Sequence, residues 1–133
     1  MNYFPQLNTL LDFASAPYSG FNVASIVVTT DNKIYKGVNV ESAAYPTTNC
    51  AERNAIQTAV TEGAKVGDIK EVHILARNAQ QQLVQAYPCG SCRQVIAEQS
   101  GNDAMIYCYA SETQVAKHSI AELLPHAFLG GEL

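Results

Sequence analysis

A few residues of this 133-residue chain have the types and the spacing to bind and use a metal ion. Cys50 stands two residues before Glu52, and the run Pro88-Cys89-Gly90-Ser91-Cys92 carries two further cysteines. Two thiolates separated by two residues can reach one ion from a turn that leads into a helix, and a third from another helix start completes one face of a tetrahedron. Three protein ligands leave one vertex open, as in catalytic zinc sites. The pattern predicts a catalytic zinc centre held by Cys50, Cys89 and Cys92.

A fourth protein ligand would instead close the site and make it structural. The remaining candidates are Cys108, His73, His118 and His126. Cys108 lies inside an apolar run, 105–109, where a thiol is expected to behave as a small buried hydrophobe. We expect His73 to be a hydrogen-bonded histidine of the core or sheet edge, and His118 and His126 to be surface residues. A closed structural zinc module remains the alternative.

Three charged residues next to the predicted ligands have the chemistry to support catalysis. Glu52 is close enough to reach the open vertex, where a carboxylate can take a proton from an activated water and later deliver it to a substrate. Three thiolates and Zn²⁺ sum to a charge of −1, and Arg53 and Arg93 follow the ligand-bearing turns directly. Their guanidinium groups could withdraw charge from the sulfurs. The simpler alternative is a glutamate favoured by the helix dipole and two solvated arginines.

The first half of the chain contains two helical patterns and one hairpin. Residues 2–17 predict a helix with Asn2 as N-cap, an apolar face that runs to Ala14 and a stop at Pro17. The β-branched run 23–30 and the segment 34–40 flank Asp31-Asn32, which is typical of a hairpin. A further amphipathic helix is predicted over 50–62, ended by Gly63. This helix begins at a predicted metal ligand.

The second half alternates strands and short helices. We predict a buried strand at 72–76, a helix at 92–99 and a strand at 105–109. Ser119 and Glu122 form a capping-box pattern for a last helix that Pro125 ends, and 113–116 is a weaker strand pattern. The order of elements predicts a single α/β domain, 1–133, with helices on both faces of the sheet.

Composition excludes several classes of function. The net charge of −4 offers no positive field for a phosphate backbone, so nucleic acid is not expected as a partner. The longest uncharged stretch, 13–30, is too polar for a membrane span, and the N-terminus lacks the pattern of a secretory signal. We therefore expect a cytoplasmic chain whose cysteines bind metal rather than form disulfides. A charged content of only 15% suggests faces that are buried between subunits.

The cysteine and glutamate pattern resembles that of zinc-dependent nucleobase deaminases. Further motifs in the same order narrow the resemblance to the small, homotetrameric cytidine deaminases, over about residues 16–128. The similar blocks are 17–23, 37–41, 50–53, 88–94 and 122–128. The chain departs from this family after Val23, where Ala24-Ser25-Ile26 replaces the usual Gly-Ala-Ala, which we interpret as altered strand packing behind the pocket.

The resemblance implies a fold, a reaction and a cofactor. The fold would be a three-layer α/β/α arrangement with a central mixed five-stranded sheet. The reaction would be the hydrolytic deamination of cytidine and 2′-deoxycytidine to the uridine nucleosides, with release of ammonia, in pyrimidine salvage. One Zn²⁺ per subunit and Glu52 as the proton shuttle would carry it out. Homotetramer assembly is implied as well.

The resemblance also implies roles for six pocket residues. Asn39 and Glu41 would bind the ribose hydroxyls, and residues two apart on a strand do face the same side. Phe21 would pack on the pyrimidine, and the backbone N–H of Ala51 would bind the base carbonyl. Two aromatic residues would complete the pockets of neighbouring subunits: Tyr45 and Phe128.

Three other readings stay open at this point. One is a deaminase of a related cytosine nucleoside such as blasticidin S, whose enzyme shares the Cys-Ala-Glu and Pro-Cys-x-x-Cys elements. Another is a polynucleotide deaminase, although such enzymes typically have His where Cys50 stands and need a basic surface. The third is the non-catalytic zinc module described above.

Overall fold

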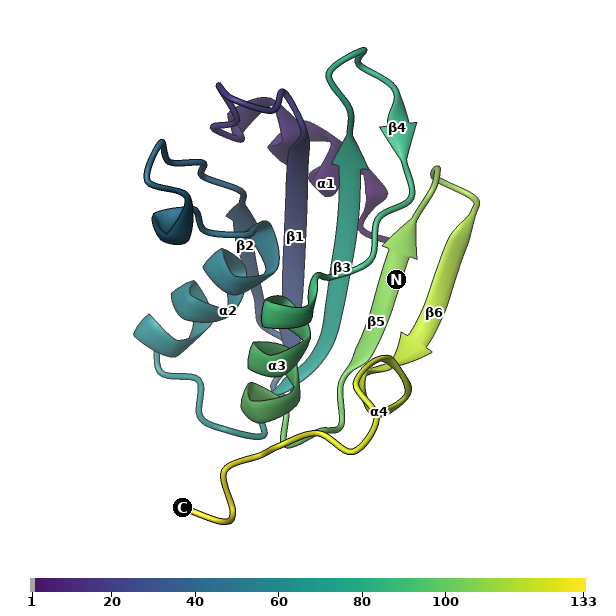
Figure 1. Cartoon of the computed structure of the whole chain (residues 1–133). Helices are drawn as coiled ribbons and strands as arrows, with labels where there is room; N and C mark the ends of the chain where they lie inside the picture. Colours follow the sequence, from purple (N-terminus) through teal and green to yellow (C-terminus); the bar gives the residue numbers. More distant parts are fainter. Residues whose placement is uncertain (1) are drawn as a thin grey trace.

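A mixed sheet forms the centre of the protein, which a computed structural model describes over residues 2–133 (Figure 1). Five strands follow the order β2-β1-β3-β5-β6, and a sixth, β4, pairs with β3 at one end. Only β3 and β5 are parallel; the other neighbours are antiparallel. The strands are β1 (Asn22–Thr29), β2 (Ile34–Val38), β3 (Ile69–Arg77), β4 (Leu83–Val84), β5 (Met105–Tyr109) and β6 (Val115–Ser119).

Helices cover both faces of this sheet, which confirms the predicted α/β/α layering. On one face lies α1 (Phe4–Leu10), continued by a 3₁₀ turn at Leu11–Phe13; on the other lie α2, α3 and α4 (Figure 1). The bounds of these three are Ala51–Thr61, Gly90–Gln99 and Ile120–Leu123, and a second 3₁₀ turn spans Tyr45–Thr47. The two-residue β4 was not predicted, because so short a segment has no periodic pattern.

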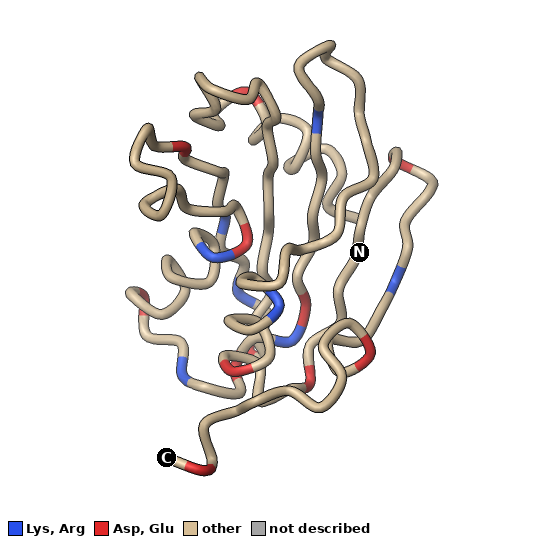
Figure 2. Tube along the Cα trace, viewed as in Figure 1, with Lys and Arg blue, Asp and Glu red and all other residues tan. Residues whose placement is uncertain are grey.

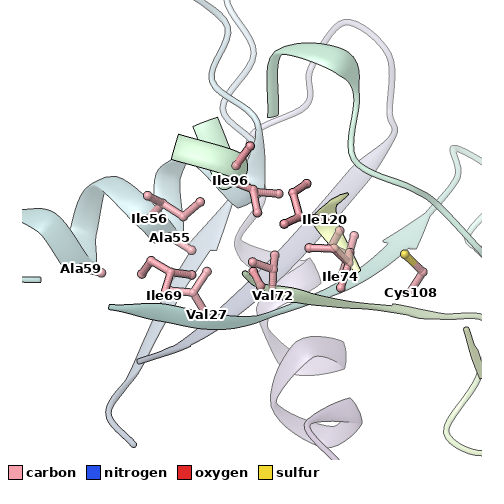
Figure 3. Packing of buried hydrophobic residues seen from close by; sticks show 13 residues of the cluster. Val27, Ala55, Ile56, Ala59, Ile69, Val72, Ile74, Ile96, Cys108 and Ile120 are labelled. Atoms are coloured by element: carbon pink, nitrogen blue, oxygen red, sulfur yellow. The ribbon is translucent and has the colours of Figure 1, made fainter. Parts of the chain in front are cut away.

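The core consists of one apolar cluster on each face. Figure 3 shows the larger, in which side chains of α2, α3 and α4 pack on those of β1, β3 and β5. The smaller lies under α1 and contains Tyr3, Leu7, Leu11, Ala24, Ile26, Val28, Leu75 and Tyr109. The central strands therefore bury both faces, as the short, mainly apolar run 72–76 predicts.

The first helix is shorter than predicted. Instead of continuing past Ala14 toward Pro17, the chain leaves the helix after Phe13, and Ala14 has an extended backbone. The reason is a competing pairing: Ser15 N–H donates to the Asn39 carbonyl at 3.0 Å, and its own carbonyl accepts from Glu41 N at 2.8 Å. The N-cap of α1 is Tyr3 rather than the predicted Asn2, which lies one residue earlier and whose Oδ1 accepts from the backbone N–H of Phe4 at 2.8 Å.

The two ligand-bearing helices begin at cysteines. Cys50 is the N-cap of α2 and Cys89 the N-cap of α3, so the second helix starts two residues before the predicted Cys92. Helix α2 packs directly on β2 at Gly37, where a Cβ would lie 2.4 Å from Ala55 N. Glycine is thus required at this position for α2 to approach the sheet.

Two further expectations can be compared with the fold. The weak strand pattern at 113–116 corresponds to β6, shifted to Val115–Ser119. At the departure from the family motif, Ser25 is fully buried on the face that carries α2, beside Gly37 and Ile74, and its hydroxyl has no hydrogen-bond partner in the described chain. Ala24 and Ile26 belong instead to the smaller cluster under α1, so the segment packs on both faces of β1, and the interpretation as altered strand packing stays a prediction.

Charged residues are distributed over many elements. Figure 2 shows Lys and Arg on strands, helices and loops, with acidic residues near them, rather than gathered along one element. Within residues 2–133, the helices are all too short or too polar to cross a lipid bilayer.

Candidate metal centre and active site

The folded chain brings the three predicted ligands together. Their Sγ atoms lie within 4.8 Å of one another, and those of Cys50 and Cys89 are 4.0 Å apart. Zn–S bonds of about 2.3 Å in a tetrahedron require sulfurs about 3.8 Å apart, so the three thiols fit a zinc ion. In the described part of the chain this is the one group of three or more His, Cys, Asp or Glu side chains with such geometry.

The other four candidate ligands do not belong to this group of cysteines. Cys108 is fully buried in the larger apolar cluster, as predicted. His73 is buried and hydrogen-bonded to Tyr109 and Glu71, which confirms its interpretation as a core histidine. His126 is exposed, whereas His118 is half-buried and contacts the Tyr87 ring, so it is not the simple surface residue that we expected.

The environment of the cysteines favours thiolate at Cys50. A hydrogen bond from Cys92 and the guanidinium of Arg53 lower the pKa of Cys50 to about 5. Arg53 Nη2 donates to Cys50 Sγ at 3.3 Å. The hydrogen bond with Cys50 and, second, burial raise the pKa of Cys92. Because Cys50 is the N-cap of α2, the free N–H groups of the first turn of this helix add to the stabilisation of the thiolate.

Glu52 is a buried carboxyl group in the first turn of α2. Its side chain lines the pocket beside the cysteines, and the residue is only 4% exposed. Burial raises the pKa of Glu52 to about 7, and the negative charge of Cys50 contributes to this shift. A carboxyl group that exchanges its proton near neutral pH suits general acid and base chemistry.

A pocket of about 240 Å³ opens next to the cysteines. Among its lining residues are four of the predicted substrate-binding residues: Phe21, Asn39, Glu41 and Ala51. The lining includes two carboxylates, from Glu41 and Glu52, and no Lys or Arg of residues 2–133. The lining of this pocket therefore disfavours an anionic ligand.

Asn39 and Glu41 are held by the loop in front of β1. Asn39 Oδ1 accepts from Val23 N–H at 2.9 Å, and its Nδ2 donates to the Phe21 carbonyl at 2.8 Å. Glu41 Oε1 accepts from the backbone N–H groups of Tyr18 and Ser19, both at 3.1 Å, and Oε2 accepts from the Ser19 hydroxyl. These bonds, the hydroxyl foremost, lower the pKa of Glu41 and keep it charged.

The two arginines near the cysteines differ in their contacts. Arg53 donates directly to a ligand sulfur, as we expected. Arg93 donates instead to backbone carbonyls, through Nε to Pro88 at 2.7 Å and through Nη1 to Leu123 at 2.9 Å. The expected donation to sulfur is therefore wrong for Arg93, because the first turn of α3 directs its side chain toward α4.

The two residues expected to act in neighbouring subunits lie outside the pocket of this chain. Tyr45 is 80% exposed and Phe128 is 52% exposed. Sequence reasoning also missed several lining residues: Ser19, Val23, Thr48, Asn49, Ile74, Ala86 and Tyr87. Ser19 and Val23 lie inside a recognised block and could have been assigned, but Ile74 and Ala86 enter only through the pairing of β3 with its neighbours.

Cysteines at two helix starts, with a buried carboxyl group beside a pocket, define a metal-dependent hydrolytic enzyme. Residues 2–109 match the family described as the cytidine and deoxycytidylate deaminase zinc-binding region. The chain belongs to this family, which confirms the predicted resemblance and the prediction of a zinc-binding enzyme.

Individual relatives agree with this assignment over most of their lengths. A cytidine deaminase from Halalkalibacterium halodurans is 34% identical over 120 residues, which are 90% of this chain and 86% of the relative. One from Mycoplasma genitalium is 34% identical over 92% of this chain and 90% of its own. A crystal structure of cytidine deaminase from Burkholderia pseudomallei has a TM-score of 0.84 and 33% identity, and covers 94% of this chain and 95% of its own.

Proposed function

We propose that this protein catalyses the zinc-dependent hydrolytic deamination of cytidine and 2′-deoxycytidine. Water and the nucleoside yield uridine or 2′-deoxyuridine and ammonia. The observation that carries the proposal is the buried Glu52 carboxyl group, which lines the same pocket as Cys50 and Cys89. The activity named for the relatives agrees with it.

Glu52 moves the protons of the proposed reaction. Cys50, Cys89 and Cys92 would hold Zn²⁺, which would supply the Lewis acidity that activates a water molecule. Glu52 accepts a proton from that water and donates it to ring N3 as the water oxygen bonds to C4. A second proton passes through Glu52 to the amino group, the C4–N bond breaks, and ammonia leaves. The burial and the raised pKa of Glu52 support both the uptake and the release of a proton by this side chain near neutral pH.

The remaining pocket residues are proposed to orient the nucleoside. Ala51 is the first residue of α2, so its N–H has no acceptor within the helix and is available to the base carbonyl. Phe21, 37% exposed at the pocket wall, would pack on the pyrimidine. Asn39 and Glu41 would bind the sugar hydroxyls while the loop at Tyr18 and Ser19 holds the carboxylate in place.

The charge of the pocket favours a nucleoside over its 5′-monophosphate. The family includes enzymes for both kinds of substrate, as its description states. A phosphate group needs cationic or N–H donors, but the charged lining residues of this chain are Glu41 and Glu52. Glu41 stays ionised because the Ser19 hydroxyl lowers its pKa. A nucleotide would therefore meet repulsion rather than binding.

We further propose a homotetramer that acts in the cytoplasm in pyrimidine salvage. The low charged content and the exposed aromatic rings of Tyr45 and Phe128 support contacts between subunits. Both side chains are proposed to complete a neighbour's pocket. Light scattering combined with activity measurements tests this: an active monomer would refute it.

The decisive test is an ultraviolet assay of the purified protein with a panel of substrates. We expect turnover of cytidine and 2′-deoxycytidine, at least 100-fold slower turnover of cytidine 5′-monophosphate and of blasticidin S, and loss of activity after chelation that added Zn²⁺ restores. No turnover by a zinc-loaded sample would refute the enzyme and favour a structural zinc module. Faster turnover of blasticidin S would refute the assignment to cytidine. A gel-shift at low salt checks for nucleic-acid binding.

A further inference from the structure

The face of the sheet opposite the cysteines contains a buried polar network that the proposed reaction does not use. His73, on β3, is 1% exposed, and Tyr109, on β5, is 2% exposed. His73 Nδ1 lies 2.8 Å from the Tyr109 hydroxyl oxygen, and Nε2 lies 2.9 Å from Glu71 Oε1. Tyr109 in turn accepts a hydrogen bond from the backbone N–H of Tyr3 at 3.3 Å. The network therefore links the centre of the sheet to the residue where α1 begins.

Aromatic rings enclose the imidazole on several sides. The Tyr107 ring stacks on His73 with centroids 4.4 Å apart and an interplanar angle of 4°. The Tyr3 ring meets it edge to face at 4.7 Å. From the neighbouring strand β1, the residue opposite His73 is the apolar Ile26. A charged imidazolium in this position would be largely cut off from water.

The neutral form of His73 satisfies every hydrogen bond of this network. The Tyr3 N–H can only donate, so the Tyr109 oxygen accepts from it. The Glu71 carboxylate can only accept, so Nε2 carries the ring proton. Nδ1 is then the acceptor for the Tyr109 hydroxyl proton. Each group has one role in this arrangement, and no donor is left without an acceptor.

Adding a proton at Nδ1 disrupts this arrangement. Nδ1 becomes a donor, so the Tyr109 oxygen faces two donors and its own hydroxyl proton loses its acceptor. In the described chain, the Tyr109 hydroxyl has no partner besides His73 and Tyr3. A buried donor without an acceptor is destabilising.

We propose that His73 is an acid-sensitive lock that fastens the N-terminal segment, defined as residues 2–13, to the sheet. In its neutral form, His73 holds the Tyr109 hydroxyl in the orientation that accepts from Tyr3. Protonation of His73 releases this anchor at the start of α1. The segment is then held by its apolar contacts through Leu7 and Leu11 and by three polar contacts in the described chain. These are the bond from Asn2 Nδ2 to the Glu112 carbonyl, the bond from Asn22 Nδ2 to the Leu11 carbonyl and the ion pair of Arg77 with Asp12.

Burial and the charged groups around His73 act on its pKa in opposite directions, and burial dominates. Burial lowers the pKa of His73 below its ordinary value, and Glu71 on the same strand opposes this only in part. Tyr3, Tyr107 and Tyr109 face the imidazole from the other elements, and Lys117 Nζ on β6 lies 5.5 Å from the Tyr107 ring centroid. A lowered folded-state pKa means that the stabilisation is complete above the unfolded value and is lost as the pH falls.

Amide hydrogen exchange of the full zinc-loaded chain tests the lock, measured by NMR between about pH 7.5 and about pH 5. Protection factors, which correct for the intrinsic pH dependence of exchange, are compared between α1 and α2. We expect α1 protection to fall by up to about tenfold per pH unit below the unfolded histidine pKa, which is the limit for one proton. Protection of α2 is the internal reference and should change less.

Three variants and one direct titration separate the lock from general acid destabilisation. His73→Gln, which can donate to Glu71 and accept from Tyr109 without titrating, should remove the pH dependence of α1 protection. Tyr109→Phe should lower that protection roughly two- to tenfold already at neutral pH, the loss expected for a hydrogen bond. The Tyr107 hydroxyl takes no part in the network, so Tyr107→Phe is the matched control, and its α1 protection should match that of the wild type.

The proposal is overturned if α1 protection does not fall in acid, or falls equally in wild type and His73→Gln. If His73→Gln does not fold, the NMR titration of His73 in the wild-type chain still tests the proposal. A His73 pKa clearly below the ordinary histidine value of about 6.5 supports the lock, and one at or above that value overturns the proposal.

Discussion

The two faces of the sheet use buried polar groups in opposite ways. On the face with α2 and α3, Cys50 and Glu52 sit beside an open pocket, and their protonation is tuned by burial and by Arg53. On the α1 face, the hydrogen bonds of His73 and Tyr109 are satisfied within the protein. A polar group that takes part in a reaction must be able to contact the substrate. A buried polar group with a structural role is stabilising only when all of its hydrogen bonds are formed within the protein.

The same two strands supply both faces. Ile74 lines the pocket while its neighbour His73 faces the opposite side, and on β5 Cys108 alternates with Tyr107 and Tyr109. This follows from the two-residue period of a strand, which sends adjacent side chains to opposite faces. Substitutions at adjacent strand positions should therefore affect either the pocket or the cluster under α1, but not both.

The largest effect is expected from removing a ligand. Cys50→Ala should abolish zinc binding and activity, because two thiolates cannot hold the ion in a three-ligand site. Cys108→Ala is the matched control on the same face: it should retain zinc and cost only about 1–2 kcal/mol from the small cavity. Metal analysis and urea unfolding measure both, and zinc loss in Cys108→Ala would show that the ligand assignment is wrong.

The next largest effect is expected at Glu52. Glu52→Gln keeps the size of the side chain but cannot exchange a proton, so kcat should fall by about 10⁴-fold, the upper range for general acid and base catalysis. Zinc content should be unchanged, because Glu52 is not among the clustered ligands. Kinetics and metal analysis are run on one sample. A variant that retains substantial activity would remove Glu52 from the mechanism.

On the opposite face, a core substitution should affect stability without affecting chemistry. Leu7 is fully buried under α1, and Leu7→Ala should lower the free energy of unfolding by about 2–5 kcal/mol. The exposed neighbour Gln6 supplies the control Gln6→Ala, which should be nearly neutral. Urea unfolding gives the stability, and kcat of the folded fraction should match the wild type. A large drop in kcat for Leu7→Ala would mean that the two faces are coupled.

The smallest effects are expected at the two arginines. Arg53→Gln removes the donor to Cys50 Sγ and should lower zinc affinity or kcat/KM by about 10- to 100-fold. Arg93→Gln loses its bonds to the carbonyls of Pro88 and Leu123 and should mainly reduce stability, by about 1–3 kcal/mol. Zinc competition assays and thermal unfolding separate the two. If Arg53→Gln and Arg93→Gln lowered zinc affinity equally, the different roles inferred for the two arginines would be wrong.

Much of the fold could be predicted because the patterns are local. The apolar spacing of 50–62 and the turn at Asp31-Asn32 depend on neighbours in sequence, and both appear as expected in α2 and the β1–β2 hairpin. The end of α1 could not be predicted. Ser15 leaves the helical path to pair with residues 39–41, and no local pattern reveals a partner that is so distant in sequence.

In the candidate site, too, local sequence patterns predicted some residues, whereas others depend on contacts between distant parts of the chain. The ligand cysteines and Glu52 were predictable because they form two short local patterns, Cys-Ala-Glu at 50–52 and Cys-x-x-Cys at 89–92, each at the start of a helix. The contacts of Arg93 were not, because Leu123 lies 30 residues away. The pocket lining by Ile74 and Ala86 likewise depends on strand pairing.

By itself, the sequence determined the set of metal-binding side chains, the proton-transferring carboxyl group and the family, because residue type and short spacing suffice for these. Only the tertiary structure decided that His73 and Tyr109, 36 residues apart, share a hydrogen bond. It also decided that the Tyr3 backbone joins them across more than 100 positions. The physical reason is that strand register, which pairs His73 with Tyr107, is set by the packing of whole layers rather than by any local preference.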